Sequence, residues 1–298
     1  MSDARAHTGR VIANYGARLL VRDDKGHLHR CAALRKLGLI VSGDLVEWQP
    51  QSSGDARVTS VFARQTLLQR PDRRGQLKPV AANLKQLAIV SAIKPGVETL
   101  LIDQYAAAAE LAGIEPVIVV NKSDLLDEPA RREMQAMLSV YQQIGYRTAM
   151  IDCKSDAGIR PLQRLLRDQI SMLVGQSGVG KSSIVQKLFP DLEIQVGALS
   201  EASGSGAHTT TVTSWYDLPG GGALIDSPGV RQFSLEHLTQ QDLARGFRDI
   251  RELAGNCRFH NCTHLHEPDC AVRRALADGR LADWRYGNYC KLSEPPQD

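Results

Sequence analysis

Long hydrophobic runs are absent from this chain of 298 residues. No apolar stretch approaches the roughly 18 residues that a membrane-spanning helix requires. The first residues, Met1-Ser-Asp-Ala-Arg-Ala-His-Thr8, also lack the apolar core of a secretion signal. The sequence therefore predicts a cytoplasmic protein that does not contact a membrane.

An excess of one charge is missing too. The chain has 36 Lys and Arg against 33 Asp and Glu, which leaves a net charge of only +3. Overall charge therefore does not indicate a nucleic-acid partner, and any basic surface must be local. Basic residues do gather between Arg64 and Pro79, which we interpret as a linker. The sequence leaves open whether this linker is merely solvated or contacts RNA phosphates.

Cysteine is scarce, with six residues in the chain. In a reducing compartment thiols stay reduced or bind metal, and they do not pair. Cys257, Cys262 and Cys270 fall close together, whereas the other three lie apart. Three thiolates and one imidazole form the closed tetrahedral site that is typical of structural zinc. Spacing alone leaves three candidates for the imidazole, which are His260, His264 and His266.

The first part of the chain, from about residue 9 to residue 68, consists of short alternating segments broken by turn residues. A hairpin is expected over 9–21, with its turn near Asn14–Gly16, and further strands are expected over 41–48 and 56–62. Such a series of strands favours a small closed barrel, and an OB-fold in particular. Barrels of this kind bind RNA or act as purely structural modules, and the pattern does not decide between the two.

The pattern changes at residue 84, where fully apolar strands begin to alternate with helices. Strands are expected over 86–93, 115–120, 147–151 and 170–174, and helices over 100–112, 129–144 and 162–169. This alternation predicts a parallel sheet that is covered on both faces.

The motif Gly175-Gln-Ser-Gly-Val-Gly-Lys-Ser182 fits the phosphate-binding loop G-x-x-x-x-G-K-[ST]. A short apolar strand precedes it and a helix follows, which is the context that the motif requires. Glycines let backbone N–H groups converge on a phosphate, and the helix presents its positive end. Lys181 is expected to contact the β- and γ-phosphates, and the Ser182 hydroxyl to bind Mg²⁺.

A second motif, Asn121-Lys-Ser-Asp124, follows the strand at 115–120. Ligands of open α/β sheets bind at the carboxyl ends of the strands. There the Asp124 carboxylate can accept hydrogen bonds from the ring N–H and the exocyclic amine of guanine, a pair of donors that adenine lacks. Asp152-Cys-Lys-Ser155, after the next strand, is placed to close over the base. The two motifs together predict a GTP site.

Two later segments complete a GTPase. His208-Thr-Thr-Thr211 lies in a predicted loop, and Asp226-Ser-Pro-Gly229 ends a predicted strand. Asp226 and a threonine of the first segment can complete the magnesium shell, and the Gly229 N–H can meet the γ-phosphate. Val230 stands where Ras-like enzymes carry the glutamine that orients the attacking water, so another group must have this role. We predict that it is His208, which lies beside the threonines. The alternatives are a group that a partner supplies in trans and a purely structural role for His208.

The order of these elements is unusual, because the base-reading motif precedes the phosphate loop. The chain therefore resembles a circularly permuted GTPase. With a barrel in front and a Cys/His cluster behind, nearly the whole chain resembles the RsgA (YjeQ) family. The resemblance rests on the motifs at Asn121–Asp124, Gly175–Ser183, His208–Thr211 and Asp226–Arg231. It also rests on the spacing C-x₄-C-x-H-x₅-C, which selects His264 as the fourth metal ligand.

The resemblance implies GTP hydrolysis that the 30S ribosomal subunit stimulates, a late role in the maturation of this subunit, and contact with its rRNA. It implies one structural Zn²⁺ per chain and Mg²⁺ with GTP. We expect a multidomain chain: an OB-fold barrel (1–68), a basic linker (69–83), a permuted α/β GTPase domain (84–232) and a mostly helical zinc domain (233–298). No strong dimer seam is present, so a monomer is expected.

The predicted site residues are the following. GTP binding is assigned to Asn121, Lys122, Ser123, Asp124, Cys153, Lys154, Gly175, Gln176, Ser177, Gly178, Val179, Gly180, Lys181, Ser182, Ser183, Thr210 and Gly229; Mg²⁺ to Ser182 and Asp226; Zn²⁺ to Cys257, Cys262, His264 and Cys270; and catalysis to His208. The last helices, over 271–276 and 281–292, carry Arg273, Arg274, Arg280 and Arg285 with Trp284 and Tyr286. These residues suit RNA contact and helix packing equally well.

Overall fold

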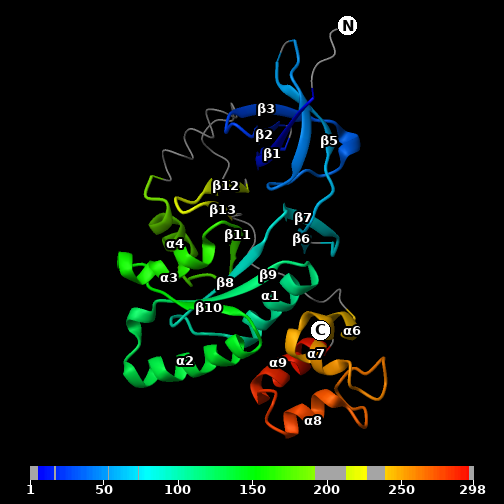
Figure 1. The fold of residues 1–298 in the computed structure, drawn as a ribbon, viewed down its shortest axis with the longest axis vertical. Helices are drawn as coiled ribbons and strands as arrows, with labels where there is room; N and C mark the ends of the chain where they lie inside the picture. Colours follow the sequence, from blue (N-terminus) through cyan, green and yellow to red (C-terminus); the bar gives the residue numbers. More distant parts are fainter. Residues whose placement is uncertain are drawn as a thin grey trace. The chain divides into compact units, whose positions relative to one another are not determined.

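The fold is that of a computed structural model, which describes residues 6–16, 18–52, 54–72, 74–191, 213–226 and 239–294 (Figure 1). Contacts between residues divide the chain into two units. The first comprises 1–85, 166–172 and 185–230, and the second comprises 86–165, 173–184 and 231–298. Each unit is described by itself.

The first unit contains a closed five-stranded barrel. Its strands are β1 (His7–Asn14), β2 (Arg18–Arg22), β3 (Leu28–Ala33), β4 (Leu45–Gln49) and β5 (Ala56–Val61), with a short 3₁₀ turn η1 (Arg35–Leu37). They pair in the order β1-β2-β3-β5-β4, and β4 closes onto β1. β3 and β5 run parallel. Apolar side chains such as Val11, Val21, Val46 and Trp48 fill the interior. The predicted OB-fold barrel and its first hairpin are confirmed.

The stretch interpreted as a basic linker contains a hairpin. Strand β6 (Leu67–Pro71) pairs antiparallel with β7 (Leu77–Ala82), and Lys78 forms an ion pair with Asp72 at 2.8 Å. The Asp72 carboxylate also accepts from the backbone N–H groups of Arg74 and Gln76, which orders the turn. Sequence reasoning missed this element because proline and charged residues obscure its alternation.

The remaining strands of the first unit are β12 (Ser214–Asp217) and β13 (Gly222–Asp226), which form an antiparallel hairpin. β13 pairs parallel with the first part of β11 (Gln169–Val174), so that Ile225 lies beside Met172. The last two residues of β11 belong to the second unit.

The second unit is built on three parallel strands in the order β10-β9-β8. These are β8 (Gln86–Ala92), β9 (Glu115–Asn121) and β10 (Arg147–Met150), and every residue of β8 is buried. Helices α1 (Thr99–Leu111), α2 (Glu128–Gln143) and α3 (Asp156–Leu166) connect the strands, with a short 3₁₀ turn η2 (Ser123–Leu125) after β9. The predicted α/β alternation is confirmed.

Helix α3 starts six residues earlier than the sequence predicted, and Pro161 lies inside it. The Asp152 side chain accepts from the backbone N–H groups of Lys154 and Ser155, which orders the turn that leads into the helix. After β11 the chain continues into α4 (Lys181–Leu188).

The C-terminal part is helical, as expected. It contains α6 (Gln240–Gly246), α7 (Arg248–Ala254), α8 (Ala271–Ala277) and α9 (Asp283–Ser293). The Thr239 side chain caps α6 by accepting from the Asp242 N–H. Phe247, Ile250, Val272 and Tyr289 form a core that also includes Ala107 of α1. A Cβ atom at Gly246 would lie only 3.0 Å from that of Ala107, so these helices pack closely on α1.

In the described ranges, the structure contains no helix with the length and hydropathy needed to cross a bilayer.

Candidate functional site

The phosphate loop lies between β11 and α4, in the predicted strand–loop–helix context. Gly175, Gly178 and Gly180 have φ values of 142°, 82° and 94°, a region that other residues rarely adopt. A Cβ atom at Gly175 would lie 2.0 Å from the Val90 carbonyl oxygen, and one at Gly180 would lie 2.4 Å from Asn121 Nδ2. Glycine is therefore required both by the turns and by the close approach of neighbouring segments.

Lys181 is folded back over this loop. Its Nζ donates to the carbonyl oxygens of Gly175 (2.6 Å) and Gln176 (2.7 Å). The ammonium group is therefore held next to the loop, where a phosphate that met its backbone N–H groups would lie. Other loop residues are open to solvent, namely Ser177, Gly178, Ser182 and Ser183.

The base-reading motif is tied directly to the phosphate loop. Asn121, the buried last residue of β9, donates from Nδ2 to the Val179 carbonyl oxygen at 2.9 Å. Lys122 has a left-handed conformation with φ of 63°, and its Nζ donates at 2.7 Å to the carbonyl oxygens of both Gly178 and Lys94. Two segments more than fifty residues apart in sequence thus form one site.

The third segment, Asp152–Ser155, meets the same motif. Lys154 Nζ pairs with the Asp124 carboxylate at 2.5 Å, and this hydrogen bond lowers the pKa of Asp124. Cys153 Sγ lies 3.6 Å from Asn121 Oδ1. The buried Ser123 is held by its N–H, which donates to the Ile151 carbonyl oxygen at 3.0 Å. The Asp124 carboxylate is therefore ionised and positioned by a cation beside the carboxyl end of β9.

The other predicted site residues lie in the first unit or outside the described residues. Asp226 is the last residue of β13, in the first unit. It follows Ile225, which pairs with Met172 of β11. His208, Thr210 and Gly229 lie outside the described residues, so their predicted roles remain predictions.

A second constellation lies in the loop between α7 and α8. Cys257, Cys262, His264 and Cys270 each place one ligand atom within 4.8 Å of the others. His264 Nδ1 is 3.5 Å from Cys257 Sγ and 3.6 Å from Cys270 Sγ, and these two sulfur atoms are 3.9 Å apart. Zn–S bonds of about 2.3 Å in a tetrahedron give sulfur atoms about 3.8 Å apart, so the group fits a zinc ion.

His264 is the histidine that faces the thiols, whereas His260 and His266 are exposed. Burial lowers the pKa of His264, which favours the neutral imidazole that a metal requires. Helix α9 fixes the backbone of this loop, because the hydroxyls of Tyr286 and Tyr289 donate to the carbonyl oxygens of His264 and Thr263, both at 2.7 Å.

A buried polar cluster joins the C-terminal helices to α1 and α2, and sequence reasoning missed it. Arg285 is 1% exposed, pairs with Asp103 of α1, and binds both carboxylate oxygens of Asp249 at 3.1 Å. Tyr141 and Asn288 each donate to Asp103 at 2.7 Å. These two carboxylates outweigh the effect of burial and raise the pKa of Arg285. A lone aspartate within the apolar run of α1 is the signal that could have revealed the cluster.

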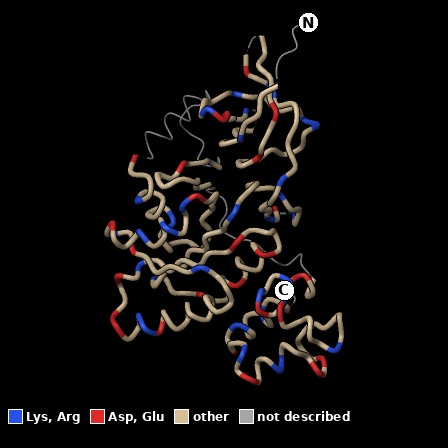
Figure 2. The backbone as a smooth tube through the Cα atoms, viewed as in Figure 1, with Lys and Arg blue, Asp and Glu red and all other residues tan. Residues whose placement is uncertain are grey.

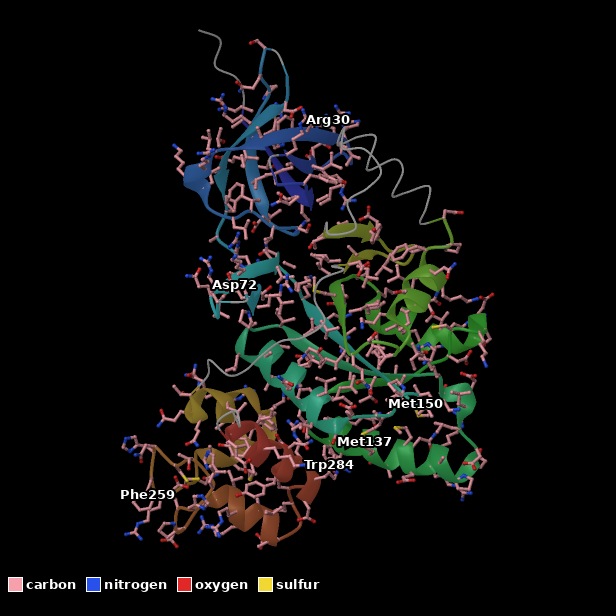
Figure 3. All side chains as sticks on the ribbon, turned by 180° about the vertical axis from the view of Figure 1, so that it is seen from behind. Arg30, Asp72, Met137, Met150, Phe259 and Trp284 are labelled. Atoms are coloured by element: carbon pink, nitrogen blue, oxygen red, sulfur yellow. The ribbon has the colours of Figure 1, made fainter. Side chains whose placement is uncertain are left out.

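Three residues considered for RNA contact are therefore packing residues. Arg285 is buried in the cluster, and the Tyr286 hydroxyl donates to the backbone of the loop between α7 and α8. Trp284, labelled in Figure 3, reaches from α9 towards α2, where its ring is 5.3 Å from that of Tyr141. Arg273, Arg274 and Arg280 are exposed. Figure 2 shows basic residues spaced along the C-terminal helices. Phe259, labelled in Figure 3, lies at the outer side of the loop between α7 and α8 and is 38% exposed.

Comparison with known proteins agrees with the arrangement of these motifs. The family model described as RsgA GTPase matches residues 61–236, which include both the base-reading motif and the phosphate loop. This chain belongs to the RsgA GTPase family. The protein is accordingly a GTPase, and the permuted order of its motifs is that of its family.

Similar proteins cover nearly the whole chain. A protein of Ectopseudomonas mendocina named "Small ribosomal subunit biogenesis GTPase RsgA" is 44% identical over 98% of this chain and 86% of its own. One of the same name from Pseudomonas fluorescens is 45% identical over 95% of this chain and 83% of its own.

Two solved structures are also similar. The crystal structure of YjeQ from Thermotoga maritima matches with a TM-score of 0.79 and 29% identity, over 97% of this chain and 98% of that one. The structure of YloQ, described as a circularly permuted GTPase, matches with a TM-score of 0.78 and 25% identity, over 100% of this chain and 99% of that one.

Proposed function

We propose that this GTPase binds the small ribosomal subunit, assists its late maturation, and hydrolyses GTP in response to the subunit. One observation carries the proposal: relatives named for small-subunit biogenesis match 98% of this chain, including the parts outside the nucleotide site. The barrel and the C-terminal helices would supply the contacts to the subunit, with Arg273, Arg274 and Arg280 exposed for rRNA phosphates. The protein would act as a monomer in the cytoplasm.

The site residues have distinct roles in this proposal. Asp124 accepts from the guanine ring N–H and amine, while the stem of Lys122 covers the purine and Asn121 ties the two loops together. The backbone N–H groups of the phosphate loop and Lys181 neutralise the β- and γ-phosphates. Ser182 and Asp226 would hold Mg²⁺, which supplies further charge stabilisation when bound. Thr210 and Gly229 would complete the γ-phosphate contacts.

GTP turnover should be measured alone, with purified 30S subunits and with 50S subunits, at fixed salt concentration. We expect strong stimulation by 30S subunits only, because activating partners of such enzymes raise turnover by about 10³-fold or more. GTP binding without stimulation by either subunit would leave a GTPase whose partner is another RNA, and would contradict the ribosomal role. Binding of the chain to 30S subunits without faster turnover would instead identify an rRNA-binding factor that uses GTP as a slow switch.

His208 is proposed as the group that positions the attacking water. Replacing it by alanine should lower 30S-stimulated turnover by about 10²-fold, the usual effect of losing a positioned general base. GTP affinity should stay within about twofold, because the base and phosphate contacts lie elsewhere. The control is Ser205→Ala, a nearby change that leaves the imidazole and the three threonines in place. Equal turnover of wild type and His208→Ala would assign the role to a group of the ribosome.

The Cys257–Cys270 cluster is proposed to hold one structural Zn²⁺. All four ligand positions come from the protein, so no position remains for a substrate. Removal of the metal by a chelator should lower the melting temperature of the C-terminal helices and release one zinc per chain, measured with a colorimetric zinc indicator. Cys262→Ser should abolish zinc retention, whereas His266→Ala should not, because His266 is exposed. Zinc retention by Cys262→Ser would refute the ligand assignment.

A further inference from the structure

The loop between β8 and α1, residues 93–98, lies between the nucleotide site and the C-terminal helices. On one side, Lys122 Nζ bridges the Lys94 carbonyl oxygen and the Gly178 carbonyl oxygen of the phosphate loop, both at 2.7 Å. Gln176 of the phosphate loop also donates to the Gly96 carbonyl oxygen at 3.4 Å. The position of the loop therefore sets the position of the lysine whose stem covers the guanine base.

On its other side, the loop runs into Thr99, the first residue of α1. Asn288 of α9 donates from Nδ2 to the Thr99 hydroxyl at 3.1 Å and to the Asp103 carboxylate at 2.7 Å. Asn288 is 5% exposed, so these bonds do not compete with bulk water. The C-terminal helices thus hold the point at which the loop ends.

Helix α9 contacts two different segments with adjacent residues. Arg285 and Asn288 bind α1, whereas Tyr286 and Tyr289 donate to the backbone of the metal-binding loop. A cavity of about 300 Å³, lined by Ile93, Val97, Thr99, Leu126, Ala130, Glu133, Met134 and Met137, lies beside the β8–α1 loop. The loop therefore has room to shift towards α2 when its anchor on α9 changes.

We propose that Asn288 is a positioning residue for the guanine-nucleotide site, acting through Thr99 and the β8–α1 loop on Lys122. Nucleotide binding and the arrangement of the C-terminal helices are then coupled. By thermodynamic linkage, anything that moves α9 changes nucleotide affinity, and nucleotide changes the environment of α9 to the same extent. The coupling uses described residues of one unit and does not depend on the identity of the ribosomal partner.

The test is the dissociation constant for GDP, measured by calorimetry on the full chain. Thr99→Val removes the accepting hydroxyl and keeps the β-branched shape, and it should raise this constant about three- to tenfold, the effect of one net hydrogen bond. Asn288→Ala should do the same, and the double variant should show no further loss because both changes break one link. Thr99→Ser keeps the hydroxyl and should restore wild-type affinity.

Ser293→Ala is the matched control. It removes a buried hydroxyl from the same helix, one that donates to the Tyr289 carbonyl oxygen within α9. Its GDP affinity should stay within about twofold of wild type. Thr99→Val with the same affinity as Ser293→Ala would overturn the proposal, whether or not Asn288→Ala folds.

A second readout separates positioning from a general loss of stability. The chain has three tryptophans, and Trp284 of α9 packs on Tyr141. In protein labelled with 5-fluorotryptophan, the ¹⁹F resonance of Trp284, assigned with Trp284→Phe, should shift when GDP is added to wild type and to Ser293→Ala. The shift should be lost in Thr99→Val at saturating GDP. An unchanged resonance in the wild type, or an equal shift in Thr99→Val, would refute the coupling.

Discussion

Replacing Asp124 by asparagine is expected to weaken GTP binding by about 10²- to 10³-fold. In the proposed site the carboxylate accepts from two donors of guanine, and hydrogen bonds to charged groups contribute about 1.5–3 kcal/mol each. An amide keeps the shape but presents an N–H₂ group to one of these donors, which places two donors against each other. The variant also loses the ion pair with Lys154 that positions the side chain.

The same substitution should improve binding of xanthosine triphosphate, because xanthine carries a carbonyl oxygen where guanine carries the amine. Titration of both nucleotides against wild type and Asp124→Asn gives a reversal of preference if Asp124 reads the base. Asp127→Asn is the matched control, since this nearby carboxylate caps α2 by accepting from the Ala130 N–H and asparagine caps equally well. Retention of GTP affinity in Asp124→Asn would remove Asp124 from the base site.

The nucleotide site could be predicted from sequence because its chemistry is local. The phosphate loop needs glycines at fixed spacing, and the base-reading motif needs four consecutive residues after a strand, so both are visible without a fold. The Cys/His cluster could be predicted for the same reason, since its four candidate ligands lie within fourteen residues. Spacing alone left open which histidine is the fourth ligand. His264 is the buried histidine that lies beside the three thiols, and it is the one that the resemblance implies.

The contacts of the C-terminal helices could not be predicted, because they join residues that are far apart in the chain. Asn288 and Thr99 are separated by 189 positions, and Arg285 was as consistent with RNA contact as with packing. Only the fold shows that its partners are Asp103 and Asp249. The hairpin at β6–β7 was missed for a different reason, since its strands are short, contain Pro71 and Pro79, and do not alternate regularly between buried and exposed residues.

Replacing Asp103 by alanine should lower the free energy of unfolding of the second unit by about 3–5 kcal/mol. The carboxylate is fully buried, and its removal leaves Arg285 with one ionic partner, Asp249, in an apolar environment. It also leaves the Tyr141 hydroxyl and one Asn288 N–H without their acceptor. Urea unfolding followed by the ¹⁹F resonance of Trp284, which packs on Tyr141, measures the loss in protein labelled with 5-fluorotryptophan.

Two further variants test whether the loss of stability in Asp103→Ala comes from the buried charge that remains on Arg285. Asp278→Ala removes a carboxylate from an exposed ion pair with Arg280, where both side chains are 59% exposed, and should have little effect. Asp103→Leu combined with Arg285→Met removes the buried ion pair and fills the space, so it should recover part of the stability that Asp103→Ala loses. The recovery should be incomplete, because Asp249 loses its partner and the Tyr141 hydroxyl and one Asn288 N–H still lack an acceptor. Equal midpoints for Asp103→Ala and Asp278→Ala would show that the cluster does not hold the C-terminal helices on α1.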